Sequence, residues 1–74
     1  MIKCEVEKEI AVLSANGKKC LRLDLVSWND EPATYDLRFW YESKPEGRLA
    51  GKGIIMTEEE VYNLHKALTE YFSS

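Results

Sequence analysis

The stretch TYDLRFWYES, residues 34–43, contains four aromatic side chains, with Asp36 and Arg38 between them. In a β-strand, successive side chains point to opposite faces of the sheet, so this stretch divides into two sets. One set is Tyr35, Leu37, Phe39 and Tyr41, and the other is Asp36, Arg38 and Trp40. The first set predicts a core face. The second set puts a tryptophan beside a cation on the face that would meet water.

Two further strands are expected before this stretch. Residues 4–14 and 20–28 both alternate apolar and polar side chains, and Asn16-Gly17 between them is typical of a two-residue hairpin turn. A turn at 16–17 pairs residues whose numbers add up to about 33. In that register Leu21, Leu23 and Leu25 lie opposite Val12, Ile10 and Lys8. Lys8 is the exception on an apolar face, and it needs a bulge or a strand end.

The rest of the chain predicts one more strand and a helix. Residues 29–33, with Pro32, form a turn, residues 43–47 form a loop, and residues 48–57 form a strand whose Gly51 and Gly53 indicate a bend or bulge. Thr57 and Glu60 have the spacing of a capping box, so a helix is expected to start at Thr57. An apolar helical stripe follows, consisting of Val61, Leu64, Leu68 and Tyr71 or Phe72.

The predicted fold class is therefore α+β: a four-stranded antiparallel meander followed by one C-terminal helix, in a single domain spanning residues 1–74. The helix is expected to cover the leucine-rich face of the sheet incompletely. A homodimer is expected because one helix cannot cover that apolar surface.

Composition excludes several classes of protein. The apolar runs are too short for a membrane span, and no signal peptide is visible, so a cytoplasmic location is expected, with association with the nucleoid left open. Cys4 and Cys20 lie too far apart in the predicted register to form a disulfide. The sequence offers neither a metal-ligand spacing nor a catalytic set, so we expect no metal, no cofactor, no small-molecule substrate and no enzymatic activity. Asp24 and Asp36 are expected to pair with neighbouring arginines.

The net charge of −3 is unevenly distributed, because residues 58–74 carry −3 while residues 14–57 carry +1. A basic groove in the middle of the chain is therefore compatible with the acidic total. Trp28 and Trp40 share the polar face with Arg22 and Arg38, an arrangement that suits base stacking and phosphate contacts on a single strand. The same pattern is compatible with a protein-interaction surface or with purely structural aromatics. The glutamates of residues 5–9 share this face in the predicted register and count against nucleic acid.

The order of elements and the string YDLRFW…GRLAGKGIIMTEEEVYNL resemble the positive cofactor four family of single-stranded-DNA-binding transcriptional coactivators, most closely its short bacterial members. The resemblance runs from about Glu5 to Leu68. It implies a homodimer whose curved sheets bind single-stranded DNA, or RNA, with little sequence specificity, in transcription, replication or repair. The serine-rich regulatory arm of the eukaryotic coactivators has no counterpart here, so coactivator activity is not carried over.

By position, the resemblance makes Trp28 a base-stacking residue, Arg38 the arginine of the third strand, and Trp40 or Tyr41 the aromatic residue that follows it. Trp40 is favoured over Tyr41, because it lies two residues from Arg38 and therefore on the same face of the strand. The expected nucleic-acid-binding residues are Lys8, Lys18, Arg22, Trp28, Arg38, Trp40, Tyr41, Arg48 and Lys52. The alternative function is a protein-interaction module that docks a partner through the exposed aromatics of the sheet.

Overall fold

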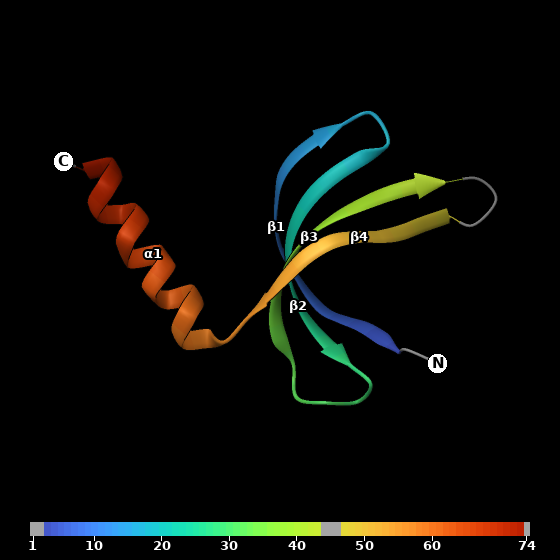
Figure 1. Cartoon of the computed structure of the whole chain (residues 1–74), viewed down its shortest axis with the longest axis horizontal. Helices are drawn as coiled ribbons and strands as arrows, with labels where there is room; N and C mark the ends of the chain where they lie inside the picture. The colour runs from blue at the N-terminus through green and yellow to red at the C-terminus, as the bar shows by residue number, and fades with distance from the viewer. Residues whose placement is uncertain (1–2, 44–46, 74) are drawn as a thin grey trace.

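A computed structural model describes residues 3–43 and 47–73 and has the expected order of four strands and one helix. The elements are β1 (Cys4–Asn16), β2 (Lys19–Trp28), β3 (Thr34–Ser43), β4 (Gly47–Met56) and α1 (Glu58–Ser73). The strands form one antiparallel sheet in the order β1-β2-β3-β4 (Figure 1). This confirms the α+β meander. The middle of the loop expected at 43–47 lies outside the described residues.

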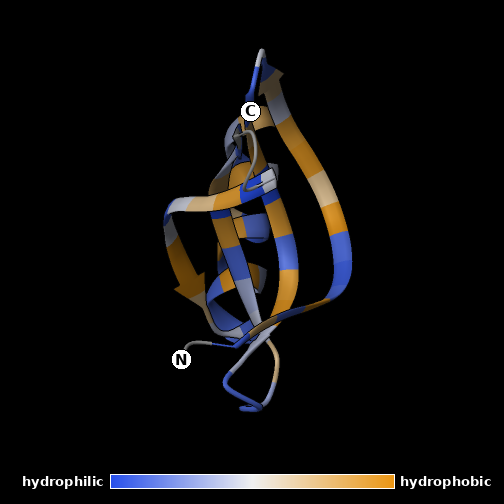
Figure 2. Cartoon of the chain, turned by 90° about the vertical axis from the view of Figure 1, so that its right-hand side faces the viewer, coloured by the Kyte–Doolittle hydropathy of each residue, from blue (hydrophilic) through white to orange (hydrophobic). Residues whose placement is uncertain are grey.

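The pairing of β2 with β3 confirms the two faces expected from the alternation. Leu21, Leu23 and Leu25 lie opposite Phe39, Leu37 and Tyr35. We call Leu21, Leu23, Leu25, Leu37 and Phe39 the leucine face. Figure 2 shows the alternation of hydrophobic and hydrophilic residues along the strands.

The predicted register of β1 is wrong over most of its length. Leu25 does lie opposite Lys8, but Leu23 lies opposite Ala11 and Leu21 opposite Ser14. Irregularities between Val6 and Lys8, Glu9 and Ala11, and Val12 and Ser14 shift the pairing by one residue each. A bulge reverses the face on which the following side chains lie, so Val12 pairs with Arg22 rather than with Leu21.

The first hairpin turn lies one residue later than expected. Asn16 pairs with Lys19 as the last residue of β1, so the turn consists of Gly17 and Lys18. Gly17 has a φ of +64°, which costs glycine no steric strain. The second turn contains Asn29 and Asp30, both with positive φ, and the Glu31 amide donates to the Trp28 carbonyl at 2.9 Å. These values describe a type I′ turn.

The helix begins as the sequence predicts, with a capping box at its N-terminus. The Thr57 amide donates to Glu60 Oε1 at 2.8 Å, and the Glu60 amide donates to Thr57 Oγ1 at 3.1 Å. These two hydrogen bonds satisfy backbone donors that the helix itself leaves free.

The helix does not cover the leucine face as expected. It stands apart from the sheet in Figure 1, and none of its residues is buried. The radius of gyration is 13.8 Å, whereas a compact chain of this length would have about 11 Å. The leucine face is only half-buried as a result, and Val26 is the one fully buried hydrophobic residue among those described.

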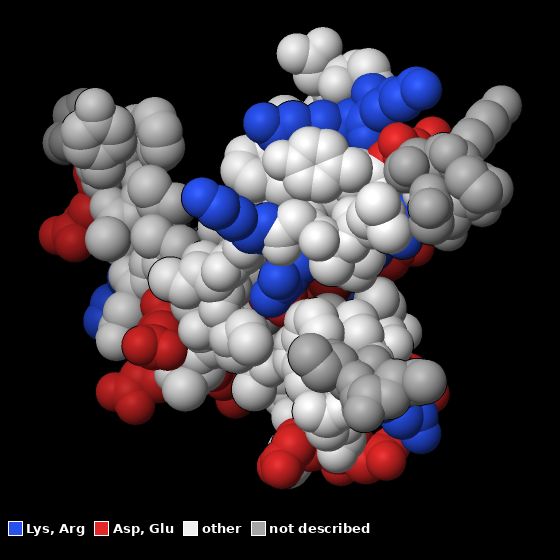
Figure 3. All heavy atoms as spheres, turned by 45° about the vertical axis from the view of Figure 1, so that its right-hand side comes forward, with Lys and Arg blue, Asp and Glu red and all other residues white. Residues whose placement is uncertain are grey.

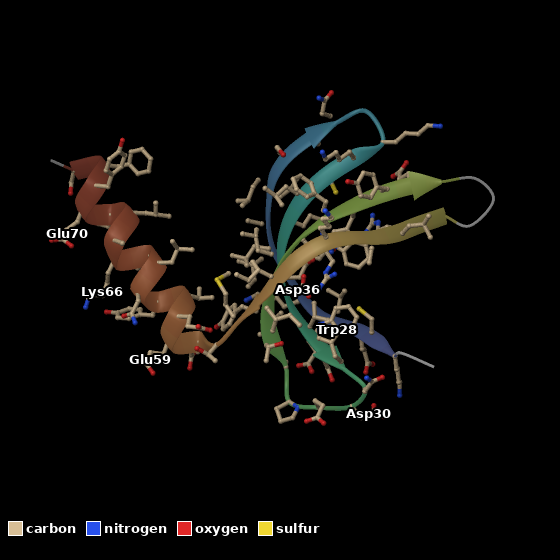
Figure 4. All side chains as sticks on the ribbon, viewed as in Figure 1. Trp28, Asp30, Asp36, Glu59, Lys66 and Glu70 are labelled. Carbon is tan, nitrogen blue, oxygen red and sulfur yellow. The ribbon has the colours of Figure 1, made fainter. Side chains whose placement is uncertain are left out.

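Three charged residues of the polar face, Arg22, Asp24 and Asp36, are buried instead, and its tryptophans are half-buried, because the sheet curves towards this face. The hairpin ends and the turn between β2 and β3 all bend away from the helix (Figure 1). Trp28 and Asp36 lie on the side of the sheet opposite the helix (Figure 4). We call this side, with Arg22, Asp24, Trp28, Asp36, Arg38 and Trp40, the concave face. Curvature brings its side chains together, whereas the convex leucine face is spread open.

Candidate functional site

The first feature of the concave face is a cluster formed by Trp28, Asp36 and Arg38. Asp36 accepts hydrogen bonds from Arg38 Nε at 2.9 Å, Arg38 Nη2 at 3.1 Å and Trp28 Nε1 at 3.2 Å. The guanidinium carbon of Arg38 lies 5.1 Å from the centre of the Trp28 ring, within range of a cation–π interaction. Arg38 Nη1 also donates to the Gly51 carbonyl at 2.9 Å. One carboxylate thus holds both the arginine and the indole in place.

A second cluster, formed by Arg22, Asp24 and Trp40, uses the same residue types. Arg22 Nη2 donates to Asp24 Oδ1 at 3.0 Å and lies 3.2 Å from Glu9 Oε1. The guanidinium carbon of Arg22 lies 5.4 Å from the centre of the Trp40 ring. Each tryptophan of the concave face is therefore backed by a guanidinium that a carboxylate fixes.

The two clusters meet where β2 pairs with β3. Arg22 lies opposite Arg38, and Asp24 lies opposite Asp36, so like charges face each other across the ladder. Such pairs are unfavourable unless other charges compensate them. Here each arginine pairs with the aspartate two residues away on its own strand. This confirms the expected pairing of the aspartates with arginines, although within strands rather than across them.

Two glycines of β4 make room for the side chains of β3. A Cβ atom at Gly53 would lie 2.7 Å from Arg38 Cβ, and one at Gly51 would run into the Tyr41 ring. The ladder also shifts register between Arg38 and Trp40, as the glycine pair predicted. The Gly-Lys-Gly motif therefore serves the close approach of Arg38 and Tyr41 to β4.

Cations gather beside Trp40 at the hairpin end of the sheet. A pocket of about 140 Å³ is lined there by Ala15, Gly17, Lys18, Lys19, Cys20, Trp40, Tyr41, Glu42 and Arg48. Figure 3 shows Lys and Arg mainly over the upper part of the sheet, with Asp and Glu at its lower edge and on the helix. Lys18 and Arg48 form no ion pair with another described residue, so their charges are available to an anion.

The remaining predicted site residues lie elsewhere. Tyr41 belongs to the leucine-face side of β3, opposite Lys19, and thus to the other face from Trp40. Lys8 pairs with Leu25 on the leucine face. Lys52 is exposed in the irregular part of β4. Trp28 and Trp40 lie in separate clusters, so the structure brings together Trp28 with Arg38, and Trp40 with Arg22, Lys18 and Arg48.

Sequence reasoning did not count Asp24 and Asp36 among the site residues. Both are 1% exposed, and they orient the arginines that lie against the tryptophans. Opposite charges two residues apart on one strand were the available indication. The sequence also predicted too many free glutamates of β1 on the concave face. Glu5 lies opposite Ser27 on the leucine side of the sheet, and Glu9 is paired with Arg22.

Each cysteine lies opposite a tryptophan of the concave face, Cys4 opposite Trp28 and Cys20 opposite Trp40. Both thiols are free. Desolvation raises the pKa of the Cys4 thiol, and the nearby Asp36 carboxylate raises it further, so the thiolate is disfavoured.

In the described residues, 3–43 and 47–73, histidines, cysteines and acids form no group of three or more that could hold a metal ion. The helix within these residues is too short and too polar to span a bilayer.

Fold and site together define a small α+β protein, with a curved four-stranded antiparallel sheet whose concave face carries two tryptophan–arginine–aspartate clusters. The chain is 35% identical over 65 residues to an uncharacterized protein of Treponema pallidum (strain Nichols). The match covers 86% of this chain and 73% of that protein, so the chain belongs to the same family. No protein-family model matches the chain.

Proposed function

We propose that the protein is a homodimer that binds single-stranded DNA, or RNA, on the concave face of its sheet. The observation that carries the proposal is the pair of tryptophans, each backed by a fixed guanidinium, on a face with cations at its hairpin end. An indole held in one orientation can stack on an unpaired base, and stacking does not depend strongly on which base is present.

Cations that form ion pairs and cations that do not are proposed to have different roles. Arg22 and Arg38 are compensated by carboxylates, so their contribution is to hold the indoles. Phosphate contacts then fall to Lys18, Arg48 and Lys52, which form no ion pair with a described residue. Three such contacts give a slope of about −2 for log K against log salt concentration, because each single-strand contact contributes about −0.7.

A second copy of the chain is proposed as the cover of the apolar surfaces. On the helix, Leu64 is 43% exposed and Leu68 is 46% exposed, and the leucine face of the sheet is only half-buried. A chain this small is marginally stable even with a full core. Because both apolar surfaces lie on the same side of the sheet, a symmetric dimer can bury them against each other and leave the concave faces open.

Fluorescence titration with a labelled oligothymidine tests the nucleic-acid part of the proposal. We expect quenching of tryptophan emission, weaker binding as salt rises, and much weaker binding of duplex of the same length. Equal affinity for duplex and single strand would contradict the proposal. Absence of any binding would favour the alternative, a protein-interaction module that uses the half-buried tryptophans of the concave face to dock a protein partner.

Sedimentation of Leu64→Glu tests the dimer. Placing a charge in the apolar stripe is expected to yield monomer and a lower unfolding midpoint. Asn63→Glu introduces the same side chain on the polar side of the helix and is expected to remain dimeric. A native chain that sediments as a monomer at micromolar concentration would contradict the proposal.

A further inference from the structure

The two clusters of the concave face differ in how completely their polar atoms are paired. In the Trp28 cluster, the indole N–H and the guanidinium both donate to Asp36. In the Trp40 cluster, three buried atoms have no hydrogen-bond partner within the described chain: Arg22 Nε, Asp24 Oδ2 and Trp40 Nε1. All the buried side-chain atoms found unpartnered in the described residues thus belong to one cluster.

Such a concentration of unpaired atoms needs an explanation. Buried polar atoms in proteins nearly always have a partner, and three exceptions within one cluster of side chains mark a place where a partner is missing. Arg22 is 3% exposed and Asp24 is 1% exposed, so bulk water does not supply the missing hydrogen-bond partner. The unpaired set consists of two N–H donors and one carboxylate acceptor.

The Trp40 cluster borders the pocket at the end of the β1–β2 hairpin. Trp40 forms part of the wall of that pocket, with Lys18, Cys20 and Arg48 around it. The indole also lies against the Arg22 guanidinium. The indole therefore borders both the pocket and the Arg22 guanidinium, and the cations beside it suit a phosphate attached to a group that binds here.

We propose that the Arg22–Asp24–Trp40 cluster takes the Watson–Crick edge of a thymine or uracil base. The proposal rests on the single-strand binding proposed above and adds a base preference at one position. The edge of thymine and uracil carries one N–H between two carbonyl oxygens. Its two acceptors match the donors of Arg22 and Trp40, and its donor matches Asp24 Oδ2.

The other bases leave part of the set unpaired. Cytosine offers one donor group and two acceptors in a different order, with its amino group at the end of the edge. Adenine has no carbonyl oxygen and offers an amino donor beside a ring-nitrogen acceptor, and guanine offers one acceptor and two donor groups. A site built to hydrogen-bond one edge discriminates strongly against bases that leave its buried groups unpaired. The expected preference for thymine over cytosine is about tenfold.

Competition among oligonucleotides of equal length on the unmodified protein tests the inference. We expect oligothymidine and oligodeoxyuridine to bind about equally, and oligodeoxycytidine about tenfold more weakly. Oligothymidine with N3-methylthymine should lose the same factor, because the methyl group removes the N–H and leaves the ring and both carbonyls in place. Equal affinity for all four, as expected if a water molecule fills the cluster, would overturn the inference and leave single-strand binding intact. If none of them binds, the proposed function itself fails.

Two matched variants test whether the preference for thymine over cytosine arises at the Trp40 cluster. Trp40→Phe keeps an aromatic ring and removes the unpaired N–H, so the ratio of thymine to cytosine affinity is expected to fall towards one. Trp28→Phe removes an N–H that Asp36 already accepts, so overall affinity falls while the ratio stays near its native value. Equal effects of the two variants on the ratio would overturn the assignment to Trp40.

Discussion

Replacing Gly53 with alanine should destabilise the protein through the contact between β3 and β4. Gly53 lies opposite Arg38, and an added Cβ atom would lie 2.7 Å from Arg38 Cβ and 2.8 Å from the Leu37 carbonyl oxygen. Neither atom lies at the flexible end of a side chain, so the strands themselves must separate. Forcing an extra carbon into a packed position costs about 1–3 kcal/mol. Alanine returns about 0.5–1 kcal/mol of backbone entropy, so we expect a net loss of about 1–2 kcal/mol.

Gly51→Ala is the matched control, because it adds the same atom two residues away on the same strand. Its new Cβ would meet the outer edge of the Tyr41 ring, which is 39% exposed and can turn aside, and then the Phe39 carbonyl oxygen at 3.1 Å. We expect a change in stability near zero. Urea unfolding of both variants at one protein concentration measures the difference.

The relative stability of the two variants tests whether Arg38 needs a glycine opposite it. If Gly53→Ala is as stable as the native protein, or if Gly51→Ala is the less stable of the two, then Arg38 does not depend on a bare β4 backbone. Arg38 is also expected to leave the Trp28 ring in Gly53→Ala, so its oligonucleotide affinity should fall more than that of Gly51→Ala.

Three further outcomes follow from contacts described above. Asp36→Ala should lower the free energy of unfolding in urea by about 3–5 kcal/mol, because it leaves Arg38 without its buried partner. Adding Arg38→Met should recover much of this loss. If stability does not recover, the broken ion pair is not the cause of the loss. Thr57→Ala should cost about 1 kcal/mol, measured in the same way, through loss of the cap, whereas a neutral result would mean that the Thr57 hydroxyl is not needed. At pH 8, Cys4 should react with iodoacetamide more slowly than in the unfolded chain, because its raised pKa leaves less thiolate, and equal rates would refute this.

The sequence predicted those parts of the fold that depend on near neighbours. The capping box joins Thr57 to Glu60, and the two faces of β3 follow from the direction of successive side chains in a strand. The bulge at the glycines of β4 was predicted for the same reason, since glycine marks it locally.

The register of β1 was not predictable from the same alternation. A bulge inserts one residue and reverses the faces beyond it, and β1 has three irregularities within thirteen residues. Lys8 was the one misfit that pointed to them. The position of Val12 opposite Arg22 depends on the accumulated shifts, which leave no mark on the sequence of β1 alone.

The candidate site was predicted in its residue types and only partly in its geometry. Sequence placed Trp28, Trp40, Arg22 and Arg38 on one face, and the sheet does so. The face was expected to be open to water, yet the side chains of both arginines are mostly withdrawn from it, with exposed fractions of 4% and 16%. The expectation was too simple because alternation assigns a side chain to a face and says nothing of how strongly the sheet curves.

The amino-acid sequence by itself determined the order of strands and helix, the helix cap, and which residues of β2 and β3 share a face, because each depends on contacts between close neighbours in the chain. Tertiary structure alone decided that Arg22, Asp24 and Asp36 of the polar face are buried and that the helix leaves the leucine face uncovered. It also decided that Asp36 pairs with both the arginine and the indole of one tryptophan cluster, while in the other Asp24 pairs with Arg22 and leaves its Oδ2 and the Trp40 N–H without a partner. These outcomes depend on sheet curvature and on contacts between distant residues, which no local pattern encodes.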